Sequence, residues 1–191
     1  YHQGQGVPQD YKTAVKWFRL AAEQGYASAQ SNLGSMYGNG TGVPQDYKTA
    51  VKWWGLAAEQ RNAYAQSLLG FAYQKGNGVL QDYKTAVKWY RLAAEQGDAS
   101  AQYRLGDMYA TGEGVPKDDK TAAKWYRLAA KQGDAAAQFN LGQRYYYEEG
   151  VSQDHKTAVR WYRLSAEQGH ATAQYNMGVM YGNGTGVIQD I

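Results

Sequence analysis

The residues of this chain that could catalyse a reaction or hold a metal ion are few and scattered. Cysteine is absent, which excludes disulfide bonds, thiolate metal ligands and cysteine nucleophiles. The three histidines, His2, His155 and His170, have neither the spacing of a metal site nor a common helical face. Capping and solvation account for the positions of the carboxylates, and no serine–histidine–aspartate arrangement is suggested. We therefore expect no catalytic residue, no metal site and no cofactor.

Two other patterns could bind phosphate groups. A glycine-rich segment at residues 39–45 resembles a phosphate-binding loop, but that motif follows a β-strand, and none is expected here. A basic row formed by Lys12, Lys16, Arg19 and their counterparts holds fourteen of the 20 basic residues, yet the net charge is only +3. We interpret the row as a solvated face. A binder of nucleic acid or anionic surfaces, and a hydrolase assembled across repeats, remain the alternatives.

The elements that must position these residues follow a strict internal repeat. The tripeptide Lys-Thr-Ala recurs every 36 residues, and a tryptophan lies five residues after each of its lysines. These lysines are Lys12, Lys48, Lys84, Lys120 and Lys156. We expect a single repeat array over residues 1–191, with units beginning near residues 10, 46, 82, 118 and 154 and partial loop sequence at both ends. We interpret the chain as a fragment of a longer protein.

Each unit is expected to contain two helices. The first, which we call the tryptophan helix, covers residues 10–24 in the first unit, where Asp10 is a natural N-cap and Ala14 and Trp17 share one face. The second, the glycine helix, covers residues 27–38 there and ends in a glycine-rich loop. Neither helix can bury its apolar face alone, so the units must stack. The expected fold class is all-α, a right-handed α/α superhelical solenoid of five 36-residue helix-turn-helix repeats.

A glycine recurs in the middle of each glycine helix, although glycine there costs up to ~1 kcal/mol relative to alanine. These residues are Gly34, Gly70, Gly106, Gly142 and Gly178. The pattern predicts a close approach of the neighbouring tryptophan helix, with which any side chain would collide. Elsewhere two turn glycines are replaced, by Glu148 and by Arg61, and we expect Asn62 to take the left-handed conformation in place of Arg61.

The repeat resembles that of a known family. The residues that carry the resemblance are Ala29-Gln30, Leu33-Gly34, Tyr37, Gly40, Gly42-Val43, Asp46, Ala50, Trp53-Trp54 and Ala57-Ala58-Glu59-Gln60. They are similar to the Sel-one-like repeat, a relative of the tetratricopeptide repeat. The resemblance implies a protein-binding adaptor of the kind found in signalling, protein quality control and bacterium–host interfaces. A branch of the family staples its helix pairs with disulfides, and the absence of cysteine separates this chain from that branch.

Some positions of the glycine helices vary between units while others barely change. The equivalents of residues 28, 32, 35 and 39 lie within ~60° of one another around the helix and vary widely, and we call them the variable stripe. In related arrays this helix lines the concave side, so the resemblance implies a groove for a protein or peptide partner. The predicted partner-binding residues are Tyr64, Leu68, Phe71, Lys75, Arg104, Asp107, Asn140, Gln143, Tyr147 and Asn176.

Aromatic residues gather at two places on the stripe. Tyr64, Leu68 and Phe71 form an apolar cluster that could anchor a partner, with packing against a neighbouring glycine helix as the alternative. A second patch lies at residues 145–147, where Tyr145 has the phase of the core and only the two tyrosines after it are available for binding.

The ends of the chain lead to a further expectation. The first tryptophan helix lacks a preceding glycine helix, and the last glycine helix lacks a following tryptophan helix, so both should expose apolar surface. We expect further repeats in the parent protein, with head-to-tail self-association of chains as the alternative. No apolar run approaches the ~20 residues of a membrane span. The sequence does not specify a cellular compartment.

Overall fold

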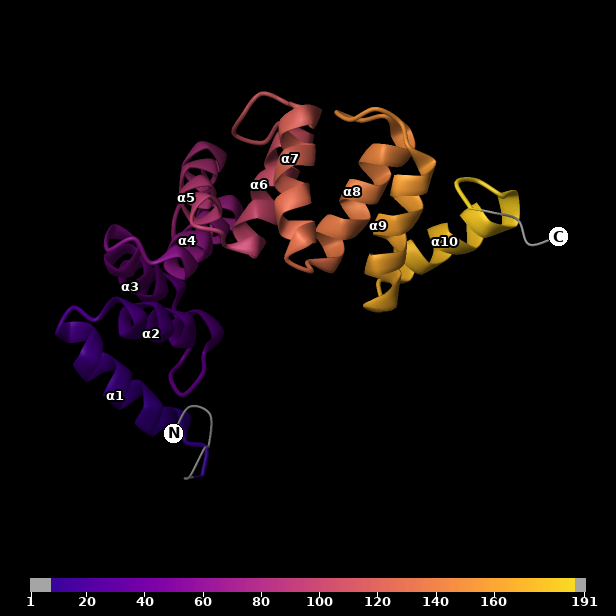
Figure 1. Cartoon of the computed structure of the whole chain (residues 1–191). Coiled ribbons are helices and arrows are strands. Elements are labelled where there is room, and N and C mark those ends of the chain that lie inside the picture. The colour runs from indigo at the N-terminus through magenta and orange to yellow at the C-terminus, as the bar shows by residue number, and fades with distance from the viewer. Residues whose placement is uncertain (1–7, 188–191) are drawn as a thin grey trace. The chain divides into compact units, whose positions relative to one another are not determined.

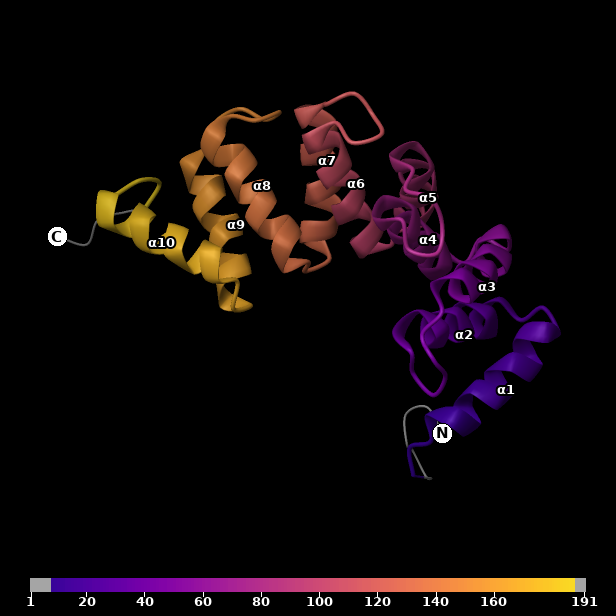
Figure 2. The same cartoon turned by 180° about the vertical axis from the view of Figure 1, so that it is seen from behind.

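The computed structural model describes residues 8–187 (Figures 1 and 2). Ten helices of 13 residues follow one another within this range, which contains no strand. The tryptophan helices are α1 (Tyr11–Glu23), α3 (Tyr47–Glu59), α5 (Tyr83–Glu95), α7 (Asp119–Lys131) and α9 (His155–Glu167). The glycine helices are α2 (Ala27–Asn39), α4 (Ala63–Lys75), α6 (Ala99–Thr111), α8 (Ala135–Tyr147) and α10 (Ala171–Asn183). The expected all-α fold of helix-turn-helix repeats is confirmed.

The helices belong to two compact units, which divide after Gln96. Unit 1 contains α1–α5 and unit 2 contains α6–α10. Within each unit every helix packs against the next one along the chain. The packing of a glycine helix against the tryptophan helix that follows it is the more extensive of the two kinds. This contact positions the surface on which the candidate site lies.

An aspartate caps every tryptophan helix, as predicted for Asp10. In α3, the Asp46 carboxylate accepts from the backbone amides of Lys48 and Thr49 at 3.0 and 3.2 Å and from the Thr49 hydroxyl at 2.6 Å. Hydrogen bonds from the threonine side chain and backbone stabilise the ionised form and hold the pKa of each capping carboxyl below its usual value. The Lys-Thr-Ala tripeptide therefore marks the first turn of a capped helix.

The central glycines of the glycine helices lie against an aromatic ring. A Cβ on Gly34 would stand 2.5 Å from Cδ1 of Trp54, and one on Gly142 would stand 2.7 Å from Cδ1 of Tyr162. Tyr90 and Tyr126 contact Gly70 and Gly106 in the same way. The predicted close approach is confirmed, and the ring belongs to the residue after the repeating tryptophan. Gly178 has nothing within 4 Å, because no tryptophan helix follows α10 within residues 8–187.

The repeating tryptophan packs backwards, onto the repeat before it. Trp53 of α3 covers the core cluster of α1 and α2, which includes Val15 and Leu33, and Trp161 of α9 covers the cluster of α7 and α8 in the same way. Trp17 occupies this position in α1 but is 60% exposed, since no helix precedes α1 in the described part of the chain. The tryptophan and the aromatic residue after it therefore both pack against the preceding glycine helix.

Buried glutamines link one repeat to the next. Gln30 is 4% exposed; its side-chain amide donates to the Ala22 carbonyl at 3.1 Å, and its Oε1 accepts from Gln60 Nε2 at 2.8 Å. Three further pairs, Gln96 to Gln66, Gln132 to Gln102 and Gln168 to Gln138, repeat this bond at 2.7–2.8 Å. Each bond satisfies a buried acceptor, which would otherwise carry a desolvation cost.

One prediction about the turns is wrong. Arg61 itself adopts the left-handed conformation, with φ of 64°, whereas Asn62 has φ of −68°. Asn62 is the N-cap of α4, and its side chain accepts from the Ala65 amide at 2.9 Å, a bond that requires extended backbone. Glu148 takes the left-handed position after α8, with φ of 60°. Both residues therefore hold a conformation that favours glycine.

Candidate functional site

The variable stripe is accessible in every repeat. None of its members is buried in the structure. Of the predicted partner-binding residues, Tyr64, Lys75 and Tyr147 are exposed and the other seven are half-buried. Stacking of the repeats therefore leaves this face of the glycine helices available.

In unit 1 the stripe opens into a pocket of about 100 Å³ between α2, α3 and α4, which we call the Trp54 pocket. It is lined by Ser35, Gly38, Asn39, Tyr47, Trp54, Tyr64, Leu68, Phe71, Ala72 and Asn77. The predicted cluster of Tyr64, Leu68 and Phe71 thus meets around one cavity. Leu68 also packs against the core, and the Tyr64 hydroxyl lies 3.4 Å from Ser35 Oγ, so the cluster contacts its neighbours as well. Lys75 is not among the lining residues.

An aromatic residue of the tryptophan helix lies under the stripe in each of these repeats. Where it is tyrosine, its hydroxyl has a polar partner: Tyr90 donates to Gln74 Oε1 at 2.9 Å. Trp54 is 4% exposed, and its Nε1 has no hydrogen-bond acceptor among the described residues. This position was not among the predicted partner-binding residues. The sequence pattern that marks this position is an aromatic residue directly after each repeating tryptophan.

In unit 2 the stripe carries a polar network between α6, α7 and α8. Asp107 Oδ1 accepts from the Tyr126 hydroxyl at 2.7 Å and from Asn140 Nδ2 at 3.3 Å. Burial raises the pKa of the Asp107 carboxyl, and the hydrogen bonds from Tyr126 and Tyr103 partly offset this rise. Burial and the Asp107 charge raise the pKa of Tyr103 to about 12. Two predicted residues, Asp107 and Asn140, are therefore hydrogen-bonded directly, and Asp107 also binds the Tyr126 hydroxyl.

The other two predicted residues of unit 2 on α6 and on α8 before Tyr147 are Arg104 and Gln143. The Arg104 guanidinium stands over the Tyr103 ring, 5.5 Å from its centroid. Gln143 is half-buried on α8. It lines neither the Trp54 pocket nor the second pocket that is described below. The neighbouring Arg144 forms ion pairs of 2.7 Å with Asp119 and with Glu149.

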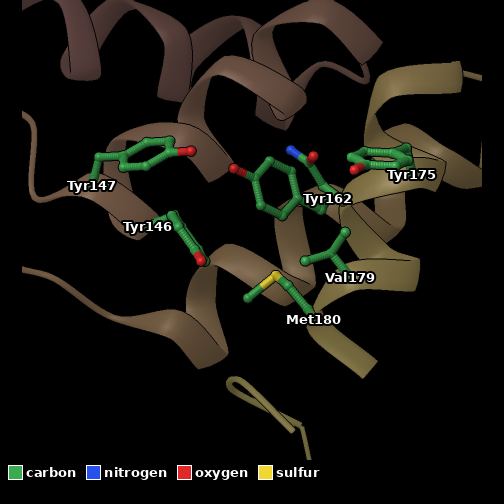
Figure 3. Close-up of a pocket in the computed structure, with 7 residues that line it drawn as sticks. Tyr146, Tyr147, Tyr162, Tyr175, Val179 and Met180 are labelled. Carbon is green, nitrogen blue, oxygen red and sulfur yellow. The ribbon is translucent and has the colours of Figure 1, made fainter. Parts of the chain in front are cut away.

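A second pocket lies further along the stripe of unit 2, between α8, α9 and α10 (Figure 3). This Tyr162 pocket measures about 200 Å³ and is lined by Tyr146, Tyr147, Tyr162, Tyr175, Asn176, Val179 and Met180. Two of the predicted residues, Tyr147 and Asn176, meet here, and Asn176 hydrogen-bonds the Tyr162 hydroxyl. Tyr145 packs into the core instead, where its hydroxyl accepts from Arg127 Nη2 at 2.9 Å.

The two pockets occupy the same place in the repeat. Six residues of the Tyr162 pocket stand three repeats of 36 residues after lining residues of the Trp54 pocket. The pairs are Gly38 and Tyr146, Asn39 and Tyr147, Trp54 and Tyr162, Leu68 and Asn176, Phe71 and Val179, and Ala72 and Met180. One location in the scaffold therefore carries two different linings.

The histidines have structural surroundings. His170 Nδ1 accepts from the Ala173 amide at 3.2 Å as the N-cap of α10, and its ring stacks on Phe139. His155 packs against the Tyr146 ring, and His2 lies outside the described residues. Across residues 8–187 there is no group of three or more histidines and carboxylates that could hold a metal ion. Nor does that range include a helix of the length and apolarity that a membrane crossing requires.

Part of the basic row makes contacts within the repeat. Arg19, Arg127 and Arg163 each donate to a tyrosine hydroxyl of the following glycine helix, at 2.6–2.9 Å. These arginines hold Tyr37, Tyr145 and Tyr181. A structural role thus accounts for three cations of the row.

Comparison with known proteins places the chain in a family. The Sel1 repeat pattern matches residues 1–26, 27–62, 63–98, 99–134, 135–170 and 171–191. The chain belongs to the Sel1 repeat family. Each full family repeat begins at a glycine helix, and so contains the extensive contact between that helix and the tryptophan helix after it. A comparison with curated protein sequences finds no match.

Two solved Sel1-type structures are similar over 96% of this chain. One is c5321, a protective antigen of uropathogenic Escherichia coli strains with an SLR fold: 44% identity, TM-score 0.91 and 39% of that chain covered. The other is a Sel1 repeat protein of Oxalobacter formigenes: 41% identity, TM-score 0.89 and 75% of that chain covered. Cysteine-rich protein B of Helicobacter pylori is 25% identical, with a TM-score of 0.54, over 68% of this chain and 92% of its own. The present chain thus spans about two fifths of the E. coli antigen.

Membership of the family sets the general type of protein. The Sel1 repeat fold generally mediates protein–protein interactions, and proteins built from it are generally non-catalytic scaffolds.

Proposed function

We propose that this Sel1 repeat protein is a non-catalytic scaffold that binds a protein or peptide along the variable stripe of its glycine helices. The observation that carries the proposal is the pair of equivalent pockets. The scaffold opens a cavity at one location in the repeat, and the residues around that cavity differ between unit 1 and unit 2. A partner that binds along the stripe would contact different side chains at each pocket.

The lining residues are suited to anchoring a partner. Aromatic side chains supply large contact areas at little conformational cost, and they dominate the binding energy of many interfaces. Tyr64 is 49% exposed and Tyr147 is 60% exposed, so both present their rings to solvent while standing at the edge of a pocket. The polar network at Asp107 lies between the two aromatic stations in sequence and supplies hydrogen-bonding groups.

The stripe can be tested by quantitative recovery of partners. The double variant Tyr64→Ala/Phe71→Ala removes two walls of the Trp54 pocket, and we expect it to reduce recovery of specific partners at least about tenfold, since hot-spot truncations cost 2 kcal/mol or more. The control is Leu56→Ala/Leu92→Ala, which truncates two exposed leucines of tryptophan helices in the same unit. Circular dichroism would confirm that both variants are folded.

The outcome separates the stripe from other surfaces. Loss with the tyrosine–phenylalanine variant and retention with the leucine variant supports the proposal. Equal recovery of every partner by wild type and both variants would contradict it. Loss of all binding in raised salt, with the stripe variant behaving like wild type, would instead favour a binder of nucleic acid or anionic surfaces through the basic row.

A further inference from the structure

We propose that the Tyr162 pocket receives an arginine side chain of the partner, held between tyrosine rings. The inference rests on the proposed function, because it names the chemistry that one station of the stripe would select. Four of the seven lining residues are tyrosines, so the walls consist largely of aromatic surface. The electron-rich faces of such rings attract cations, and a planar guanidinium also stacks on them.

The arrangement of the tyrosines leaves both ring surface and hydroxyl groups available. Tyr146 and Tyr147 meet edge to face, with ring centroids 4.8 Å apart and planes at 76°. Figure 3 shows the Tyr147 and Tyr162 hydroxyls directed toward one another, with Tyr175 on the opposite side of Tyr162. Hydroxyl oxygens and the Asn176 amide oxygen can accept from the five N–H donors of a guanidinium. A neutral apolar side chain could donate to none of these oxygens.

The electrostatic surroundings favour a positive charge. No lysine or arginine lines the pocket. Tyr146 and Tyr147 form the C-terminal end of α8, where the helix dipole is negative, and Glu148 and Glu149 follow directly. Burial is the largest cause that raises the pKa of the Tyr162 hydroxyl, and the charge of Glu149, which is also ion-paired with Arg144 at 2.7 Å, contributes less.

The Trp54 pocket shows what the same location looks like without these features. It also has aromatic walls, but Leu68, Phe71 and Ala72 stand where the Tyr162 pocket has Asn176, Val179 and Met180. Its volume is about half as large, and α2 ends in Asn39 and Gly40 without an acidic residue. The Trp54 pocket thus suits a small apolar group, and it provides an internal control for any cation that binds tyrosine rings without selectivity.

The pocket can be tested on the whole chain by NMR titration with N-acetyl-arginine amide. The isosteric neutral probe N-acetyl-citrulline amide is the control. With tyrosine rings labelled with ¹³C and assigned by single Tyr→Phe variants, we expect saturable shifts at Tyr147 and Tyr162 with a Kd on the order of 1 mM. Citrulline should give no saturation, and the signal of Tyr64 in the Trp54 pocket should not move.

Matched variants complete the test. Tyr147→Ala should abolish saturation, whereas Tyr26→Ala, which removes an exposed tyrosine between α1 and α2, should leave it unchanged. Glu149→Gln should weaken binding about threefold, since one surface carboxylate near the pocket contributes modestly to the attraction of a cation.

Three results would overturn the assignment. These are equal binding of citrulline, arginine shifts that survive Tyr147→Ala, and binding of N-acetyl-lysine amide as tight as that of the arginine probe. Each concerns the Tyr162 pocket alone. The partner-recovery test with Tyr64→Ala/Phe71→Ala addresses the stripe separately, so failure of one proposal is distinguishable from failure of the other.

Discussion

The Trp54 and Tyr162 pockets have equivalent floors and different walls. In both, the floor is the aromatic residue after the repeating tryptophan, pressed against a helical glycine. In unit 1 the residues above it include Leu68, Phe71 and Ala72, and in unit 2 three of the six are tyrosines. The floor belongs to the contact that stacks the repeats, so it can change only between large aromatic rings. The walls point away from that contact and are free to differ.

A third arrangement occurs at Asp107, which lies between the two pockets in the sequence. Arg144 stands where the pockets have Ala72 and Met180, and its guanidinium lies 5.8 Å from the centroid of the Tyr126 ring. Asp107 and Asn140 complete a network of side chains over that ring. The same glycine–aromatic contact is therefore covered by different side chains in different repeats.

The largest expected effect comes from adding a side chain at the glycine that contacts the floor residue of a pocket. Gly142→Leu would place a side chain within the Tyr162 ring, and we expect it to lower the unfolding free energy by about 3 kcal/mol, because an overpacked interface must shift. Gly178→Leu is the matched control, since the same repeat position in α10 has open space around it. Urea denaturation of both variants would measure the difference. Equal destabilisation would contradict the role assigned to the ring contact.

A smaller effect concerns the ionisation of the network at Asp107. The folded-state pKa of this carboxyl is raised above its unfolded value, so its ionisation costs stability at pH values above the folded pKa and nothing below the unfolded value. Asp107→Asn keeps an acceptor for Tyr126 and cannot ionise. We therefore expect the stability of this variant relative to wild type to increase from about pH 3 to about pH 7.

The capping carboxylates serve as a control, because their pKa values are shifted in the opposite direction to that of Asp107. The pKa of Asp118 is lowered, chiefly by the hydrogen bond from Thr121, so its stabilising contribution is present above the unfolded value and is lost as the pH falls through the folded one. Asp118→Asn should therefore lose stability relative to wild type as the pH rises. Thermal unfolding at several pH values would show both trends, and parallel curves for the two variants would rule out the proposed origin.

The smallest effect is at the strained turn of each unit. Arg61 in unit 1 and Glu148 in unit 2 hold left-handed backbone conformations, which cost a residue with a side chain about 1 kcal/mol. Arg61→Gly and Glu148→Gly should each raise the unfolding free energy by up to about that amount. Arg61→Ala removes the side chain but keeps the strain, so it should give no gain. A gain as large with alanine would mean that the arginine side chain, and not the backbone, is unfavourable.

The fold could be predicted in detail because one period governs it. A 36-residue spacing without insertion fixed the positions of Asp10 and its counterparts, and the helical glycines pointed to a neighbouring helix at close range. The error at Asn62 arose because both turn geometry and capping compete for that residue, and the sequence does not show which one prevails. The buried glutamines were also missed, since a polar residue repeated on a helix gives no sign of its partner 30 residues away.

The candidate site was predicted only as a face. Comparison of five units showed which positions vary, and Tyr64, Leu68, Phe71, Tyr147 and Asn176 indeed line cavities. The cavities themselves depend on the sizes of neighbouring side chains across three helices, which periodicity does not encode. For the same reason the floor residues Trp54 and Tyr162 were not distinguished from the core.

The glutamine pairs impose a rule on how such a chain can grow. Each pair joins residues 30 positions apart, with its donor near the end of one tryptophan helix and its acceptor in the glycine helix before it. Duplication or loss of one complete 36-residue segment leaves every donor opposite an acceptor. Insertion of a few residues within a helix would leave buried glutamine amides on both sides of the change without their hydrogen-bond partners. Such an array can therefore be lengthened or shortened in whole modules, and each added module brings another set of variable-stripe residues.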